Sequence, residues 1–289
     1  MLISSRLNLH YYPEDDKLEY IKRGIDFMRE SGFDAADLPM HLLPPEDVDV
    51  IDFMGRVKEH SQSIGMPIRV THLPFSLRIS KEPDYMPVFN KLMYRAIDGA
   101  ATLGVDCAVL HPNAITEPLE SYNEQRTRDA VLRHIAPFAE YADKLGVRLA
   151  LENMGVIRED YPTHRFCQTP EELCGVADEL GVGVCWDFGH ANMGGLKQSE
   201  ALSYVGKRLL TLHVNDNDGI GDDHVPITEG TIDWRDAMQG LANIGYNGLF
   251  NYEISTTNVP AEARCEFASG LLNSARVLVG YMEEARREY

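Results

Sequence analysis

Residues 131–153 read VLRHIAPFAEYADKLGVRLALEN, and they contain one complete unit of the pattern that decides the fold. Val131, Ile135 and Phe138 lie three and four residues apart, which predicts an amphipathic helix. Gly146 ends this helix in the prediction, because glycine readily adopts the left-handed conformation that follows many helices. The run Val147–Leu151 is rich in β-branched and apolar residues, which is typical of a strand that is buried on both faces.

The same order of helix, glycine and strand recurs along the whole chain. The glycines that fit the end of a helix are Gly32, Gly65, Gly104, Gly146, Gly181 and Gly245, with Gly206 as a further candidate. The predicted strands are Leu2–Leu9, Phe33–Leu38, Ile68–Thr71, Cys107–Leu110, Val147–Leu151, Val182–Trp186, Leu209–Leu212 and Leu249–Tyr252. A closing helix is expected from about Ala261 to Tyr289.

The predicted strands begin about 35 residues apart, and a βαβ unit needs roughly 30. Eight such units without a linker-like segment predict an α/β protein with a single (β/α)8 barrel domain over residues 1–289. The alternative is an open doubly wound sheet, which would carry a glycine-rich phosphate loop after its first strand. Residues 10–13 read HYYP instead, so the sequence favours the barrel.

The amino-acid composition limits the classes of molecule that we expect this protein to bind. The chain has 27 Lys and Arg against 45 Asp and Glu, and its formal net charge is −18. Such a surface repels phosphate backbones and anionic membranes, so we expect neither a nucleic-acid nor a membrane partner. No apolar run approaches the roughly 18 residues of a spanning helix, and the N-terminus lacks signal-peptide features. The five cysteines include no CxxC pair, which favours free thiols and a cytoplasmic location.

Polar residues gather where the predicted strands end. In a (β/α)8 barrel these carboxyl ends meet at one mouth, where active sites are built. The residues in question are His10, Asp37, His72, His111, Asn113, Glu152, Asp187, His190, His213, Asp222, His224 and Glu253. Each histidine alone could simply cap a strand carbonyl. Several carboxylates buried together require compensation, however, and a divalent cation is a common one.

Four of these residues follow the last four strands, which are adjacent around the barrel. They are Glu152, Asp187, His213 and Glu253. Three carboxylates and one imidazole form a hard, oxygen-rich ligand set, which suits Mn²⁺, Mg²⁺ or Co²⁺ better than the nitrogen- and sulfur-rich ligand sets of structural zinc sites do. Four protein ligands would leave positions on a six-coordinate metal for two oxygens of a substrate.

The motifs LEN (151–153), WDFGH (186–190), HVND (213–216) and YEI (252–254) resemble those of the xylose-isomerase-like barrel superfamily. This superfamily groups sugar isomerases and epimerases with apurinic endonucleases of the endonuclease-four type. The resemblance to the sugar-acting branch implies one divalent metal at Glu152, Asp187, His213 and Glu253. Mn²⁺ is the first expectation, and Mg²⁺, Co²⁺ and Zn²⁺ are the alternatives.

The same resemblance implies a sugar or sugar-phosphate isomerase or epimerase. Such an enzyme transfers a proton through a metal-stabilised enediolate, with Glu152 and Glu253 as the catalytic acid and base. Contacts to the small-molecule sugar substrate are expected from His72, His111, His190, Asp222 and His224. The sequence does not choose between epimerisation and isomerisation. Superfamily members often pair through their barrels, so a homo-oligomer is left open.

The endonuclease branch is an alternative, because its ligands for three Zn²⁺ ions all have counterparts in order. These are His72, His111, Glu152, Asp187, His190, His213, Asp222, His224 and Glu253. The net charge of −18 and the absence of a basic strip in the mouth loops weigh against DNA as the substrate. A dehydratase or a C-glycoside-cleaving relative that uses the same proton-abstraction site is a further alternative.

Two loops lead to further expectations about the substrate site. The segment 226–229 reads PITE where relatives have a Pro-Gly turn, and Thr228 cannot take a positive φ as cheaply as glycine. We therefore expect this substrate loop to differ in shape. The long segment Met154–Thr169 is a candidate lid. Basic residues in the mouth loops form no cluster, which favours an unphosphorylated sugar.

Overall fold

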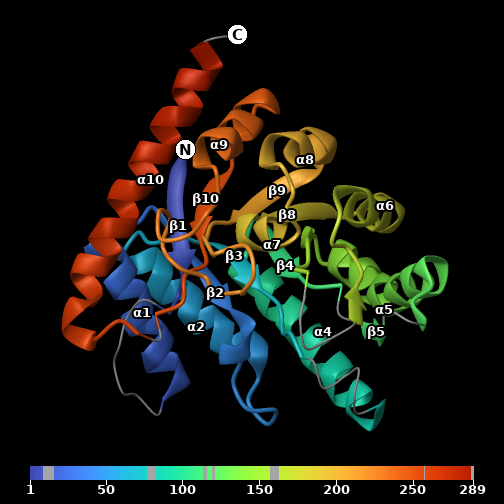
Figure 1. Cartoon of the computed structure of the whole chain (residues 1–289). Helices are drawn as coiled ribbons and strands as arrows, with labels where there is room; N and C mark the ends of the chain where they lie inside the picture. Colours follow the sequence, from blue (N-terminus) through green and yellow to red (C-terminus); the bar gives the residue numbers. More distant parts are fainter. Residues whose placement is uncertain are drawn as a thin grey trace.

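The computed structural model describes residues 1–8, 16–76, 83–112, 116–118, 121–156, 163–256 and 258–287. Eight parallel strands form one sheet in the order β10-β1-β2-β3-β4-β6-β8-β9, ringed by helices (Figure 1). The strands are β1 (Leu2–Arg6), β2 (Ala35–Pro39), β3 (Ile68–His72), β4 (Cys107–Leu110), β6 (Leu149–Glu152), β8 (Gly183–Asp187), β9 (Leu209–His213) and β10 (Leu249–Tyr252). The backbone N–H of Val214 donates to Asn251 O at 2.8 Å, which joins β9 to β10 and closes the (β/α)8 barrel.

Helices separate successive strands. They are α1 (Lys17–Ser31), α2 (Val50–Ser63), α4 (Met86–Leu103), α5 (Glu124–Lys144), α6 (Pro170–Leu180), α7 (Phe188–Met193), α8 (Gln198–Val205), α9 (Trp234–Asn243) and α10 (Arg264–Arg287). Side chains such as Asp16 and Asp49 accept hydrogen bonds from first-turn N–H groups, as good N-caps do. All six glycines predicted to end helices have positive φ, which confirms that part of the prediction.

The strand prediction is right in number and order but inexact at the ends. Cys107–Leu110 and Leu249–Tyr252 match β4 and β10 residue for residue. The first strand stops at Arg6 rather than Leu9, and His10 and Asn113 lie outside the described residues. Residues 157–162 of the predicted lid also lie outside them.

Two short strands were not predicted. β5 (Thr116–Pro118) and β7 (Thr163–Arg165) form a small antiparallel pair next to the barrel. β7 belongs to the segment expected to act as a lid, so part of that segment is a hairpin-like element fixed by pairing with the loop after β4. Three-residue strands carry too little periodicity to be found in sequence.

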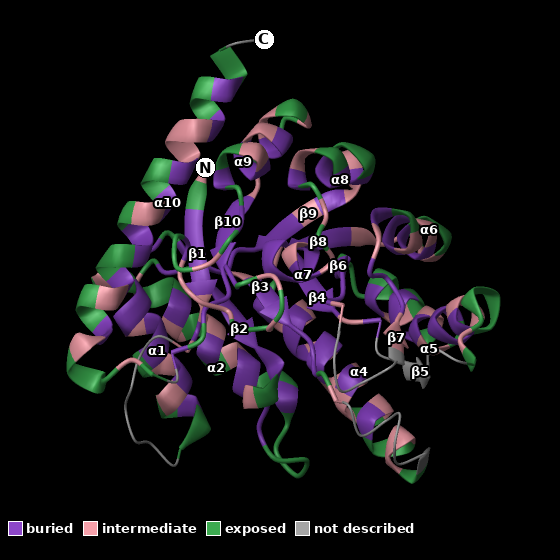
Figure 2. Ribbon diagram, in the orientation of Figure 1, coloured by how far each residue is buried: buried purple, intermediate pink, exposed green. Residues whose placement is uncertain are grey.

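The barrel strands are buried on both faces, as their continuous apolar composition predicts (Figure 2). The inner layer is built from small or branched side chains, namely Ala35, Val70, Cys107, Val109, Ala150, Cys185 and Leu249. The helices pack their apolar faces on the outside. All five cysteines are free. None of the helices in the described ranges is both long enough and apolar enough to cross a bilayer.

Candidate active site

A cavity of about 600 Å³ opens at the carboxyl ends of the strands. Its lining combines histidines, carboxylates and one arginine with a few apolar side chains. The lining residues are Arg6, Asn8, His41, His72, Leu73, Pro74, Phe75, His111, Glu152, His190, Asp222, Asp223, His224, Glu253, Ile254, Ser255 and Thr256. This composition is that of a polar reaction site rather than of a hydrophobic ligand pocket.

His213, at the end of β9, is the centre of the buried floor. Its Nδ1 lies 2.8 Å from Glu253 Oε2, 3.1 Å from Glu152 Oε1 and 3.9 Å from Asp187 Oδ2. The four side chains come from β6, β8, β9 and the residue after β10, so the adjacent strands bring them together. The sequence predicted these four residues as one set, and they do meet around a single imidazole nitrogen.

The polar atoms of this floor fit a bound cation. Both oxygens of Glu152 and both ring nitrogens of His213 are buried without a hydrogen bond, although oxygen and nitrogen lie about 3 Å apart. Buried polar atoms are nearly always hydrogen-bonded, so unpaired lone pairs that converge on one point indicate a site for a positive ion. The donor set of carboxylates and imidazole is one that hard divalent cations prefer.

Charge balance in the floor agrees with this. Burial alone would raise the pKa of Glu152, but the neighbouring charges of His213 and His111 hold it well below its usual value. Burial would likewise raise the pKa of Glu253, and His213 and Arg6 lower it. Both glutamates are therefore held as carboxylates.

Two hydrogen bonds hold the carboxylate of Asp187 in place, one from a backbone N–H and one from a side-chain amide. Its Oδ1 accepts the N–H of His190 at 2.7 Å, which caps α7, and its Oδ2 accepts Asn215 Nδ2 at 2.7 Å. Gly189 is required beside this pair, because a Cβ there would lie 2.0 Å from Asn215 Oδ1. Asn215 thus orients a predicted metal ligand from behind, as hydrogen-bond partners of ligands commonly do.

The other predicted residues form two flanking groups. On one side, His111 Nε2 lies 2.8 Å and His72 Nε2 3.4 Å from Glu152 Oε2. On the other, Asp222 Oδ1 lies 3.0 Å from His224 Nε2 and 3.5 Å from His190 Nε2.

In the second flanking group, which consists of His190, Asp222 and His224, the carboxylate raises the pKa of both imidazoles. Burial opposes protonation of His190, yet Asp187 and Asp222 hold its pKa well above the usual value. Burial lowers the pKa of His224, but contact with Asp222 raises it to about 9. Asp222 therefore lies between two imidazoles that favour the protonated form.

All nine predicted site residues lie at this mouth, but their grouping is broader than the predicted tetrad. The ligand atoms of His72, Glu152, His213 and Glu253 lie within 4.8 Å of one another, so His72 joins the set without Asp187. Asp187 forms a second such group with His190 and His224.

Sequence reasoning missed Arg6 and His41. Arg6, the last residue of β1, forms an ion pair with Glu253 Oε1. His41 lines the same wall, and burial, aided by the charge of Arg6, lowers its pKa to about 4, so it is neutral. The available signal was Arg6 itself, a charged residue that closes an otherwise uncharged strand.

The loop after β9 is anchored by Asp216. This buried carboxylate accepts hydrogen bonds from Trp234 Nε1 at 2.8 Å and from the backbone N–H groups of Asn217 and Ile232 at 2.9 and 3.2 Å. Thr228 in the same loop has a φ of 81°. Thr228 thus takes the conformation that glycine adopts more cheaply, and the expectation that this loop differs in shape from that of relatives stays a prediction.

We expect the exposed Thr228 to be strained, so Thr228→Gly should stabilise the protein. A β-branched residue at positive φ costs about 1–2 kcal/mol, and the flexibility that glycine adds to the unfolded chain offsets about 0.5–1 kcal/mol. The melting temperature should rise by about 1–3 °C in calorimetry. Thr102→Gly, within α4, is the matched control and should lower it. A lower melting temperature for Thr228→Gly would show that its backbone is not strained.

Known proteins resemble this chain in sequence. An uncharacterized protein of Methanocaldococcus jannaschii is 31% identical over 245 residues, which cover 81% of this chain and 79% of that protein. A Ketose 3-epimerase of Arthrobacter globiformis is 24% identical over 255 residues, which cover 84% of this chain and 80% of the enzyme.

Solved structures share the fold over nearly the full length. A D-tagatose 3-epimerase-like protein has a TM-score of 0.76 at 22% identity, covering 98% of this chain and 99% of its own. An L-ribulose 3-epimerase has a TM-score of 0.74 at 18% identity, covering 99% and 96%. The family profile described as Xylose isomerase-like TIM barrel matches residues 25–274. The chain therefore belongs to the xylose isomerase-like TIM barrel family.

Proposed function

We propose that this chain is a divalent-metal-dependent sugar epimerase or isomerase, with Mn²⁺ as the first candidate metal. The observation that carries the proposal is the convergence of Glu152, Asp187 and Glu253 on Nδ1 of His213 at the floor of the mouth cavity. The Ketose 3-epimerase relative and the epimerases among the structural neighbours support a sugar substrate.

Glu152 and Glu253 are suited to move a proton. They approach His213 from β6 and from the end of β10, so a sugar above the floor would have a carboxylate on either side. A divalent cation held by Glu152, Asp187, His213 and Glu253 would supply Lewis-acid stabilisation of the enediolate charge. One glutamate would take the proton α to the carbonyl and the other would return it. Return to the opposite face gives epimerisation, and return to the neighbouring carbon gives isomerisation.

The flanking groups would bind the substrate. His72 and His111 lie on one side of the floor, and His190, Asp222 and His224 on the other. Imidazole N–H groups there can donate to sugar oxygens and share the developing negative charge. In this proposal residues 1–289 act as one domain on a small-molecule sugar in the cytoplasm, without a nucleic-acid or membrane partner.

The test is solvent exchange, which requires no knowledge of the product. The protein loaded with Mn²⁺ is incubated in D₂O with a panel of ketoses, and deuterium uptake is followed by NMR. We expect uptake at a carbon next to the carbonyl of at least one ketose, and none after metal chelation. Absence of uptake with every sugar would contradict the proposal.

A second function is favoured by one specific observation: each flanking histidine group has its own carboxylate partner, Glu152 or Asp222. Three metal positions could therefore exist, as in zinc phosphodiesterases of the endonuclease-four type. Elemental analysis separates the two functions, since one metal ion per chain supports the sugar enzyme. Three Zn²⁺ per chain, together with nicking of abasic DNA, would support the phosphodiesterase.

A further inference from the structure

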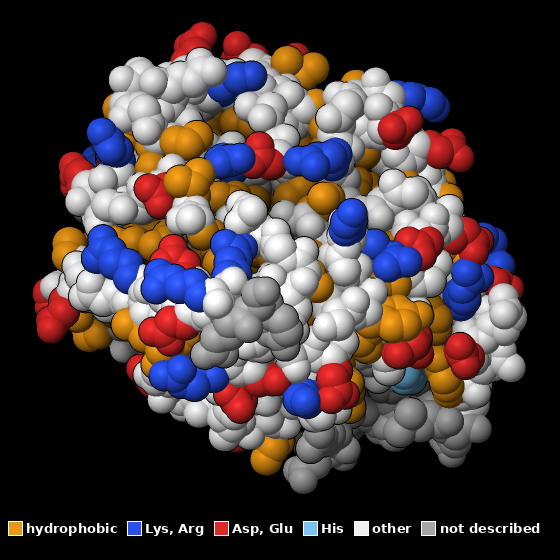
Figure 3. Space-filling model, turned by 90° about the horizontal axis from the view of Figure 1, so that it is seen from above, with side chains coloured by type: hydrophobic (Ala, Val, Ile, Leu, Met, Phe, Trp, Pro, Cys, Tyr) orange, Lys and Arg blue, Asp and Glu red, His pale blue; other side chains and the backbone are white. Residues whose placement is uncertain are grey.

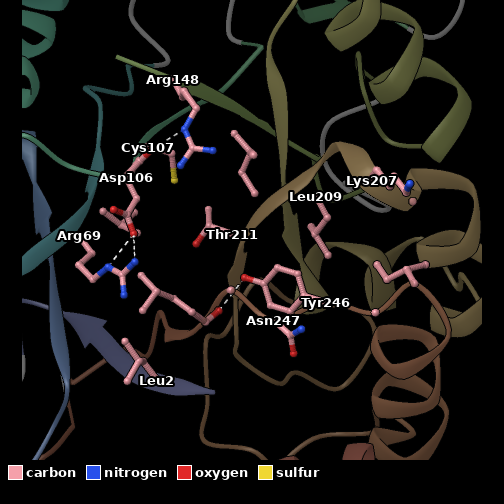
Figure 4. A pocket seen from close by; sticks show the side chains of 17 residues that line it. Leu2, Arg69, Asp106, Cys107, Arg148, Lys207, Leu209, Thr211, Tyr246 and Asn247 are labelled. Atoms are coloured by element: carbon pink, nitrogen blue, oxygen red, sulfur yellow. Dashed lines mark hydrogen bonds and ion pairs between the residues drawn. The ribbon is translucent and has the colours of Figure 1, made fainter. Parts of the chain in front are cut away.

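A second cavity lies at the opposite end of the barrel from the mouth, where the strands begin. It has a volume of about 520 Å³, within the range of small-molecule sites, and is lined by the first residues of β1, β4, β9 and β10 (Figure 4). Figure 3, which views the molecule from this end, shows Lys and Arg side chains around a hollow with hydrophobic walls.

The inner wall of this cavity is largely apolar and carries two hydroxyls, of which that of Tyr246 donates to the backbone oxygen of Leu249 at 2.8 Å. Val70, Cys107 and Leu249 come from the small inner layer of the barrel. Thr211 projects among them, is 1% exposed, and its Oγ1 has no hydrogen-bond partner. A buried hydroxyl without a partner is costly, so this position favours a ligand that supplies one.

The rim of the cavity is positive. It contains Arg69, Arg148 and Lys207 against the single acid Asp106. Arg69 is neutralised, because its Nε and Nη2 lie 2.6 and 2.5 Å from Asp106 Oδ2. Arg148 donates only its Nε, to the backbone oxygen of Asp106 at 3.0 Å. Both Nη groups of Arg148 thus have no protein acceptor among the described residues, and its guanidinium points into the cavity (Figure 4).

We propose that this cavity binds a small organic carboxylate. A guanidinium with two free Nη groups matches the geometry of a carboxylate, and Lys207 adds charge on the other side of the rim. The apolar wall would pack against the body of the ligand, and Thr211 would hydrogen-bond to a polar atom that reaches it. The formal net charge of the chain is −18, so this local excess of positive charge runs against the charge of the protein as a whole.

Thr211 also connects this cavity to the mouth. It lies two residues before His213 on β9, and both side chains are buried. Side chains two residues apart in a strand point to the same side. A ligand bound to Thr211 would therefore contact β9, the strand that also carries His213. Occupancy of the cavity could then be read in the behaviour of the active site.

The test uses benzoate as the probe and benzamide as its neutral counterpart, titrated by calorimetry into the full chain. We expect saturable benzoate binding in the millimolar range or tighter and at least tenfold weaker binding of benzamide. Arg148→Gln should weaken benzoate binding by about tenfold, as loss of a charge-assisted bidentate contact does. Thr211→Val should weaken the binding of 2-hydroxybutyrate, whose hydroxyl can reach the wall, by at least threefold.

Controls separate this site from other sources of binding. Arg208→Gln removes a charge at the same end of the barrel, but Arg208 is held by Asp178 at 2.6 and 2.8 Å, so benzoate binding should stay within twofold. Thr211→Val should not lower the melting temperature, because Oγ1 has no partner to lose. Carboxylates also bind metals, so each titration is repeated with protein that has been passed over a chelating resin. The proposal would be overturned by benzoate binding that disappears after this treatment or is unchanged in Arg148→Gln, and by 2-hydroxybutyrate binding that is unchanged in Thr211→Val.

Discussion

Glu152→Gln and Glu253→Gln should each reduce conversion of a responsive ketose to its product by about 10²–10⁴-fold, the usual contribution of a general acid or base. The amide keeps the size of the side chain but cannot accept the proton. Each glutamate lies within 3.1 Å of His213 Nδ1, so each is placed where a substrate over the floor would be. The rates of conversion and of deuterium exchange at saturating Mn²⁺ and sugar are the quantities to measure.

Glu172→Gln is the matched control for both substitutions. Glu172 also forms a pair with a histidine, since its Oε1 lies 3.0 Å from His164 Nε2, but it lies outside the mouth cavity. Its loss should leave exchange within about twofold of the wild type. Mn²⁺ binding is measured in parallel, because both catalytic candidates are also proposed ligands. Conversion that survives at the wild-type rate in either variant with metal bound would remove that glutamate from the proton transfer.

Unequal losses of exchange in the two variants would show which glutamate acts on which face of the sugar. If Glu152 takes the proton from one face and Glu253 from the other, one variant should still wash deuterium into one epimer but not convert it to the second. Such a split between exchange and conversion would assign the two roles. Equal loss of both would indicate that each variant mainly disturbs the metal.

The barrel could be predicted from sequence because its signal is local and repeated. The stretch Val131–Leu151 contains a helical stripe, Gly146 and a strand, and other units repeat it. Strand ends were less predictable, since the first strand stops at Arg6 and not at Leu9. The residues after a barrel strand are decided by what the mouth contains, and no local propensity reports that.

The sequence predicts which residues lie at the site, but it does not predict how their side chains pair. Chemistry-bearing residues at strand ends identify the mouth, because the fold brings those ends together. The pairing of Arg6 with Glu253 depends on contact between the first and last strands, which only closure of the barrel creates. The bonds from Asp187 to His190 and Asn215 likewise depend on how α7 turns after β8. These contacts are tertiary, so no periodic pattern in the sequence indicates them.

Removal of the metal should have the largest effect on stability. Glu152, Asp187 and Glu253 are at most 5% exposed and surround one imidazole, so their mutual repulsion is uncompensated by water. A cation at about a thousand times its Kd adds about 4 kcal/mol to the free energy of unfolding, since it binds only the folded chain. We therefore expect Mn²⁺ to raise the melting temperature of the chelated protein by about 5–10 °C, followed by calorimetry.

The source of that shift can be localised with His213→Asn. This variant removes the imidazole nitrogen on which the carboxylates converge, so the Mn²⁺-dependent shift should fall below about 2 °C, whereas Glu172→Gln should keep it. A shift retained in full by His213→Asn would place the metal elsewhere, for example among His190, Asp222 and His224. A protein that shows no shift with Mn²⁺, Co²⁺, Mg²⁺ or Zn²⁺ would lack the cation on which the proposed proton transfer depends.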